Sequence, residues 1–180
     1  MKDELLPDMY DKIEEESSGL GNLLAKIPGF SGYMERSRRR EADQLLRETL
    51  SARLEESRLQ LSSVHQELGR DIIKAIDFAE PLGRADTRLM GLIGKIRDAP
   101  QGYAGFFDAV KVKEDDLAEI YAFDESMLAY CDQVSVDVSA LEQATADDED
   151  VGGAIRILDG TLREANSAFA ERQELLSGFG

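Results

Sequence analysis

The chain offers few side chains for metal or nucleophile chemistry, since it has one histidine, His65, and one cysteine, Cys131. A diiron centre in a helical bundle needs two Glu-x-x-His pairs, and His65 cannot serve both. A structural zinc site or a Cys/His protease needs further cysteines or histidines. No Gly-x-Ser-x-Gly sequence supplies a serine nucleophile. We therefore predict no catalytic residue and no cofactor.

Carboxylates gather between residues 148 and 159 with a spacing that partly resembles an EF-hand calcium loop. The first, third and twelfth positions of this segment are Asp148, Asp150 and Asp159. The fifth position, Gly152, lacks a ligand atom, and no second loop is present to pair with this one. We expect an acidic corner at the start of a helix, with calcium binding as the alternative.

Arginines cluster after the corner Pro28–Gly32, and the weak anion-binding candidates among them are Arg36, Arg39 and Arg40. A glycine-containing corner that leads into a helix N-terminus can hold a phosphate or carboxylate. Acidic residues alternate with these arginines, however, and form favourable i, i+4 pairs with them. We expect a self-neutralising surface, and an anion site at Gly32 remains the alternative.

Acidic residues dominate the segment 114–150, which has 13 of them and no Lys or Arg, in a chain of net charge -16. Such a surface disfavours nucleic-acid binding, which requires a basic face. We expect part of this face to attract a basic protein partner, through Glu119, Glu125 and Asp132 among others. The alternative is that the charge only keeps the protein soluble.

The segment 98–113 is the longest predicted connection without a helix, and it carries aromatic residues among glycines and a proline. We expect it to fold onto one end of the core. Tyr103 and Phe106 are the partner-binding candidates if the loop is instead a docking surface.

The rest of the chain is predicted to be helical, because apolar residues recur three or four positions apart. The predicted helices span residues 7–26, 33–80, 83–97, 114–145 and 150–177. The second is very long, with an apolar period of about 3.67 residues that favours nearly straight packing over the strict heptads of a coiled coil. Gly69 is expected to mark a bend or a close contact in it.

Two details of this pattern predict packing. The helices 114–145 and 150–177 are joined by a short corner and should form an antiparallel hairpin along the long helix, which buries Leu61, Leu68 and Ile72. Asp124 interrupts an otherwise apolar face. We expect it to pair with an arginine of the long helix or with His65, because an unpaired buried carboxylate is too costly. The alternative is that the face opens to water at this position.

We predict one all-α domain over residues 1–180, an elongated up-and-down bundle of about five helices around one very long central helix. No apolar run is long enough to span a membrane, and the start Met1–Glu4 does not read as a secretory signal, so a cytoplasmic location is expected. The predicted function is a non-enzymatic helical interaction or scaffold protein, with homo-oligomers left open. A small-ligand or ion-binding module is the alternative.

Overall fold

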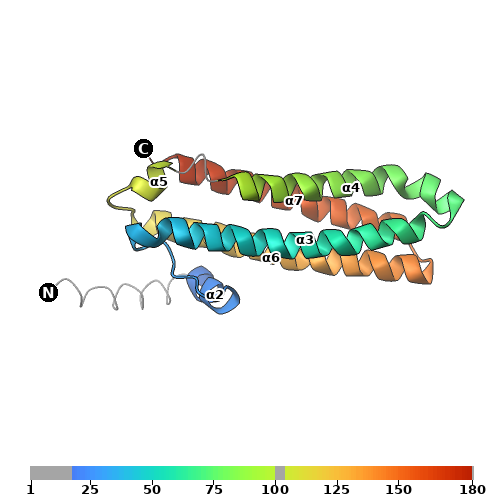
Figure 1. Cartoon of the computed structure of the whole chain (residues 1–180), viewed down its shortest axis with the longest axis horizontal. Helices are drawn as coiled ribbons and strands as arrows, with labels where there is room; N and C mark the ends of the chain where they lie inside the picture. Colours follow the sequence, from blue (N-terminus) through green and yellow to red (C-terminus); the bar gives the residue numbers. More distant parts are fainter. Residues whose placement is uncertain (1–17, 100–103, 180) are drawn as a thin grey trace.

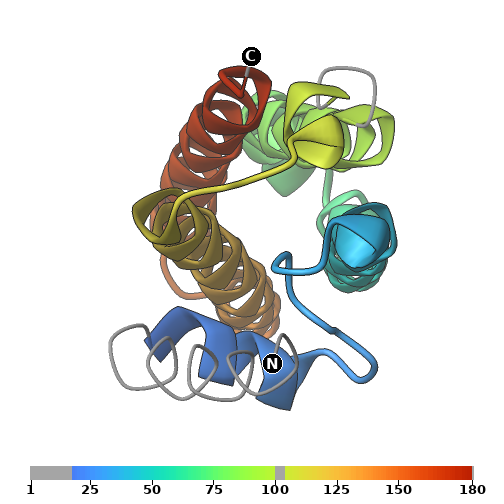
Figure 2. The same cartoon turned by 90° about the vertical axis from the view of Figure 1, so that its left-hand side faces the viewer.

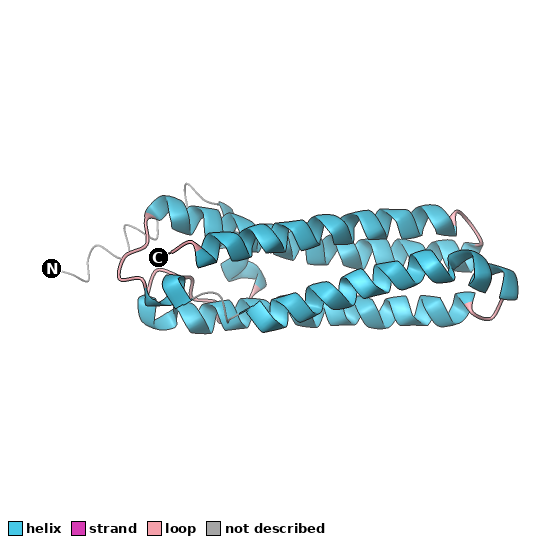
Figure 3. Cartoon of the chain, turned by 90° about the horizontal axis from the view of Figure 1, so that it is seen from above, coloured by secondary structure: helices cyan, strands magenta, loops and turns pink. Residues whose placement is uncertain are grey.

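The structure of the protein is a computed structural model, and it describes residues 18–99 and 104–179. All regular structure in these two ranges is helical, and no strand occurs in either (Figure 3). The long helices are α3 (Arg39–Leu68), α4 (Ile72–Asp98), α6 (Glu114–Asp147) and α7 (Val151–Ser177) (Figure 1). The shorter elements are α2 (Ser18–Lys26), the 3-10 helix η1 (Arg36–Arg38) and α5 (Ala104–Asp108). The prediction of an elongated all-α bundle is confirmed.

The four long helices form two antiparallel hairpins that lie side by side. One hairpin is α3 with α4 and the other is α6 with α7, while α3 packs on α6 and α4 packs on α7. Seen along the bundle, the helices follow one another in the ring order α3, α4, α7, α6 (Figure 2). The connection between α5 and α6 therefore crosses the end of the bundle, and α2 lies against α6 outside the ring (Figure 2).

The core is made of apolar residues from one face of each long helix, as expected where such residues recur three or four positions apart. From α3 and α6 it takes Leu46, Leu50, Leu54, Leu61, Val64, Leu68, Ile120, Met127, Cys131, Val134, Val138 and Leu141. The predicted burial of Leu61 and Leu68 is confirmed. The predicted helices 114–145 and 150–177 are present as α6 and α7.

The prediction of one very long helix over 33–80 is wrong, because the chain reverses direction after Leu68. Asp71 has an extended backbone and caps the next helix, its carboxylate accepting hydrogen bonds from the amides of Ile73 (2.8 Å) and Lys74 (3.2 Å). Such a cap begins a helix by satisfying amides that have no partner within it. Ile72 continues the apolar period across this break, yet it is 78% exposed, so its predicted burial is also wrong.

Pro81 lies inside α4 and does not separate two helices, although the sequence predicted a boundary at Pro81 and Gly83. A proline within a helix removes one backbone hydrogen bond and costs about 3 kcal/mol. The residues after it place Leu82, Leu89 and Leu92 in the core. Burying each of them is worth about 1.5 to 3 kcal/mol, so continuing the helix outweighs the cost of the proline.

The predicted first helix, 7–26, is described only from Ser18 onward, and the remainder lies outside the described residues. The part that is described is helical through Gly19 and Gly21 as α2. A Cβ atom at Gly19 would lie 3.1 Å from the carbonyl oxygen of Tyr121 in α6. Glycine at this position therefore allows α2 to approach α6 closely.

The segment 98–113 contains the short helix α5 and is not an irregular loop throughout. Phe106 and Phe107 are buried, and α5 packs against α7. The prediction that this segment covers one end of the core is confirmed. The docking alternative is wrong for Phe106, which has no exposed surface, and Tyr103 lies outside the described residues.

Candidate functional site

A group of buried polar side chains joins several segments near α5. Asp124 of α6 accepts a hydrogen bond from the Tyr33 hydroxyl (2.5 Å) and pairs with Nε of Arg172 (2.5 Å). Arg172 of α7 also places Nη2 2.9 Å from Oδ1 of Asp43 in α3. All four residues are fully buried. We call Tyr33, Asp43, Asp124 and Arg172 the buried polar cluster.

The predicted burial and pairing of Asp124 are confirmed, but its predicted partner is wrong. The positive charge that pairs with Asp124 belongs to Arg172 of α7, not to an arginine of the predicted long helix or to His65. His65 is exposed on α3, close to the turn that leads into α4. Arg172 is a buried guanidinium with two carboxylate partners, an arrangement that compensates its removal from water.

Burial controls the protonation of this cluster. It raises the pKa of Asp124 above the ordinary value of 3.8, and the charge of Arg172 and the hydrogen bonds from Arg172 and Tyr33 act in the opposite direction. Burial also raises the pKa of Tyr33 well above 10.0, with the charge of Asp124 adding to the effect. The Tyr33 hydroxyl therefore stays protonated and acts as a hydrogen-bond donor to Asp124.

The backbone before Tyr33 is shaped by Gly32, which has a φ angle of 73°. A Cβ atom on Gly32 would lie 2.8 Å from the Tyr121 hydroxyl oxygen. That hydroxyl accepts a hydrogen bond from the Tyr33 amide (2.9 Å). The two tyrosine rings stack with centroids 5.5 Å apart. Both the positive φ and this close approach require glycine at position 32.

One of the three candidates for the alternative anion site at the arginine corner is used inside the protein. Arg39 is buried and donates hydrogen bonds to the backbone carbonyls of Tyr33, Phe106 and Ala109. Burial and the charge of Arg36 lower its pKa. Arg39 therefore links the start of α3 to the α5 segment through Nε and Nη1, and its burial keeps it from facing an anion in solution.

The other two arginines of this corner are exposed, and they differ in their contacts. Arg40 lies over the ring of Phe107, 4.6 Å from its centroid, and pairs with Asp108 at 3.3 Å. Arg36 belongs to the 3-10 helix η1. Of the three predicted residues, only Arg40 lines a cavity described below.

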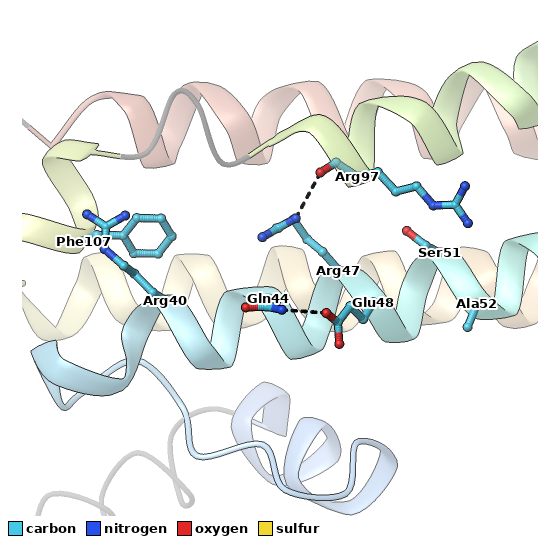
Figure 4. Close-up of a pocket in the computed structure, with 8 residues that line it drawn as sticks. All are labelled: Arg40, Gln44, Arg47, Glu48, Ser51, Ala52, Arg97 and Phe107. Atoms are coloured by element: carbon cyan, nitrogen blue, oxygen red, sulfur yellow. Dashed lines mark hydrogen bonds between the residues drawn. The ribbon is translucent and has the colours of Figure 1, made fainter.

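An open groove of about 610 Å³ runs between α3 and the ends of α4 and α5. Its lining includes Arg40, Gln44, Arg47, Glu48, Ser51, Ala52, Arg97 and Phe107 (Figure 4). Arg47 connects this groove to the buried polar cluster, since its Nε lies 2.7 Å from Oδ2 of Asp43. We call this cavity the arginine groove.

The acidic corner at 148–159 is a helix start and does not fold as a calcium loop. Asp150 caps α7, its side chain accepting a hydrogen bond from the Gly153 amide (3.0 Å). Asp148 pairs with Lys74 at 2.7 Å, and Asp159 lies within α7, 2.7 Å from Nε of Arg88. Within the described residues, no group of three or more His, Cys, Asp or Glu side chains is arranged to hold a metal ion.

Side chains of other helices pair with part of the acidic face of α6. Asp132 pairs with Arg53 (2.9 Å) and with Lys26 (3.3 Å). Glu125 accepts a hydrogen bond from Asn22 of α2. Glu119 is exposed. Basic charge from α2 and α3 therefore lies against this face, although Asp132 itself remains half exposed and its predicted role in partner binding stays a prediction.

A group of large apolar side chains is exposed at the end of the molecule opposite α5. Ile72, Ile73 and Ile76 lie in the first two turns of α4 and are 78%, 71% and 74% exposed. We call these three residues the isoleucine face. Lys74 of the same turns points to the other side of the helix, where it pairs with Asp148 of the acidic corner.

Sequence reasoning missed most of these features. Arg172 falls between Phe169 and Leu176 on the buried face of α7, and a charged residue at such a position is a signal of the same kind as Asp124. Asp43, one turn before Leu46 in α3, gives a similar signal. The sequence carries no signal for the exposure of the isoleucine face, because its isoleucines have the spacing of residues on the buried face of a helix.

No described helix is both long enough and apolar enough to cross a membrane. No family model, curated protein or solved structure matches this chain.

Proposed function

We propose that this chain is a non-enzymatic interaction module that docks a protein partner on the isoleucine face. The observation that supports this is the exposure of Ile72, Ile73 and Ile76, while the leucines and isoleucines that follow in α4 are buried. Contiguous exposed apolar residues mark interaction sites more often than scattered single ones do. Large apolar side chains of this kind form the centre of protein interfaces, inside a polar rim.

The charge around the isoleucine face indicates the kind of partner. Exposed carboxylates lie next to it in the chain, Asp71 just before Ile72 and Asp77 just after Ile76. The nearby cations are already engaged: Lys74 pairs with Asp148, and Arg70 pairs with Glu67. An apolar strip flanked by negative charge complements a basic amphipathic helix, which lays its apolar face in the contact and its Lys or Arg residues along the rim.

Self-association through this face is less well supported. A two-fold interface would place the same acidic rim of each copy against that of the other, and juxtaposed like charges disfavour binding. The proposed location is the cytoplasm, since the single cysteine, Cys131, is a buried free thiol that supplies no disulfide.

A defined peptide pair tests the proposal. The first peptide is an amphipathic helix with leucines on one face and lysines on the other, and the second replaces every lysine with glutamate. We expect the chain to bind the basic peptide in fluorescence anisotropy and to bind it more weakly as salt rises. The acidic peptide should not bind.

The matched variants locate the binding. The variant I72S/I73S/I76S should lose at least about tenfold in affinity for the basic peptide, equivalent to about 1.4 kcal/mol. Val110→Ser, which changes an equally exposed apolar residue near α5, should not. Equal binding by the two variants, or a monomer-dimer equilibrium in sedimentation velocity that the triple variant abolishes, would contradict the proposed partner.

A further inference from the structure

We propose that the arginine groove binds the carboxylate or phosphate group of a small organic molecule. Three guanidinium groups line it, from Arg40 and Arg47 of α3 and from Arg97 at the end of α4 (Figure 4). Arginine matches planar carboxylate and tetrahedral phosphate oxygens through paired N–H donors. This concentration of positive charge stands out in a chain whose net charge is -16.

A buried hydroxyl in the groove lacks a partner. Ser51 is 4% exposed, and its Oγ has no hydrogen-bond partner among the residues that the structure describes. Figure 4 shows it on the side of α3 that faces Arg97. Buried polar atoms are nearly always hydrogen-bonded, to protein or to an ordered molecule such as water. An oxyanion between Arg97 and Ser51 would accept this hydrogen bond.

Arg47 is held in position for such a ligand. Its Nε is bound to Asp43 (2.7 Å), and its Nη1 donates to the backbone carbonyl of Arg97 (3.3 Å). Asp43 in turn is fixed by Arg172 in the buried polar cluster. A guanidinium whose orientation is set by its surroundings loses less conformational entropy when a ligand binds.

The carboxylates near the groove do not block it. Glu48, the acidic residue among the lining side chains, already accepts a hydrogen bond from Gln44 (2.7 Å). Glu55 pairs with Arg97 at 3.1 Å, and Asp108 pairs with Arg40 at 3.3 Å. Both of these pairs are exposed to water, where an ion pair contributes little stability and a ligand can replace it.

The walls of the groove favour an organic molecule over a bare ion. Phe107 and Ala52 add apolar surface to the lining. A cavity volume of about 610 Å³ is within the usual range of small-molecule sites, which combine apolar walls with a few polar groups that orient the ligand. We therefore expect an anionic head against Arg97 and Ser51 and an apolar or aromatic body along the apolar part of the lining.

Four probes at fixed ionic strength test the proposal by isothermal titration calorimetry: phenyl phosphate, benzoate, inorganic phosphate and benzyl alcohol. We expect phenyl phosphate or benzoate to bind, and the stronger of the two identifies the anionic group. Inorganic phosphate should bind more weakly, and benzyl alcohol should not bind. Binding of benzyl alcohol as tight as that of both anions would overturn the proposal, and so would the absence of binding by all four probes.

Two variants place the ligand. Arg97→Gln and Ser51→Ala should each weaken binding about tenfold, as expected when a hydrogen bond to a charged group is lost. Arg84→Gln, which changes an exposed arginine elsewhere on α4, should leave binding unchanged. Thermal melting of each variant without ligand confirms that it is folded. Unchanged affinity in both groove variants would overturn the assignment.

This site is separate from the isoleucine face. The variant I72S/I73S/I76S changes residues at the opposite end of α4 and should bind the small anions as the original chain does. Loss of peptide binding with retained anion binding in this variant supports both sites. A negative result for either probe contradicts only the site that it tests.

Discussion

The two ends of this bundle use charged and apolar side chains in opposite ways. At the α5 end, charges are buried and paired, as in the contacts of Arg172 with Asp43 and Asp124. At the other end, where α3 turns into α4, large apolar residues such as Ile72 are exposed and the charges lie at the surface. Apolar periodicity therefore gives each helix an apolar face, whereas packing determines which of these faces are covered.

The difference follows from how each end is closed. At the α5 end, the segment that crosses from α4 to α6 brings Phe106 and Phe107 over the core and carries carbonyls that Arg39 binds. At the other end, two short turns join the helices, each with a capping aspartate, Asp71 or Asp150. A short turn satisfies the backbone of the helix start but provides no side chains to cover the first turns of α4.

The largest effect is expected from Arg172→Met, which leaves two buried carboxylates without their shared cation. We expect a loss of about 3 to 5 kcal/mol in the free energy of unfolding, measured by urea denaturation. Arg163→Met is the matched control on the same helix, where the arginine is exposed and 3.7 Å from Asp159, and should cost below about 1 kcal/mol. Similar losses in the two variants would remove the proposed contrast between buried and surface charge.

Leu68→Ala and Ile72→Ala compare the core with the isoleucine face at the α3–α4 turn. Leu68 is buried, and its truncation should cost about 2 to 5 kcal/mol. Ile72 is 78% exposed, and its truncation should stay within about 0.5 kcal/mol of zero. Chemical denaturation of both variants gives the result, and a large loss on changing Ile72 would mean that this residue is covered in solution.

Gly32→Ala and Gly91→Ala should change stability in opposite directions. Alanine at 32 must adopt a positive φ angle, and its Cβ atom meets the Tyr121 hydroxyl, so we expect a loss above about 1 kcal/mol. Gly91 lies inside α4, and a Cβ atom added there would have no atom within 4 Å apart from its chain neighbours and the helix's own backbone. Alanine at this position should therefore raise the free energy of unfolding by about 0.5 to 1 kcal/mol. Thermal melting separates the two signs, and stabilisation by Gly32→Ala would refute the geometry assigned to this turn.

The smallest effect concerns pH. Burial raises the pKa of Asp124 in the folded state above its ordinary value of 3.8. At a pH between the unfolded and the folded pKa of Asp124, the folded chain binds a proton that the unfolded chain does not. Protonation of Asp124 therefore raises the free energy of unfolding as pH falls through the folded pKa, and this contribution is lost as pH rises. Acidification from pH 7 to about pH 4 should therefore cost the original chain less than it costs Asp124→Asn. Urea denaturation of both proteins across this pH range checks the prediction. A larger loss of stability in the original chain than in Asp124→Asn would show that Arg172 lowers the pKa of Asp124 more than burial raises it.

The sequence predicted part of the site and missed the rest for identifiable reasons. Asp124 interrupts a local apolar pattern, which indicates its burial, but its partner lies 48 residues away in α7. Arg39 stands among other arginines, a pattern that predicts a surface cation, and only the fold brings carbonyls of the α5 segment to it. The arginine groove joins Arg47 and Arg97, which are distant in the chain, so no local pattern could reveal it.

The all-α class, the apolar faces of α6 and α7 and the burial of residues such as Leu61 follow from the order of residues, because a period of three to four residues is a local property of the chain. The reversal at Asp71 and the continuation of the helix through Pro81 depend instead on contacts between distant segments. The apolar period runs through both places, so it cannot distinguish them. The reversal depends on the cap at Asp71, and the helix at Pro81 persists because the residues after it are buried by the other hairpin.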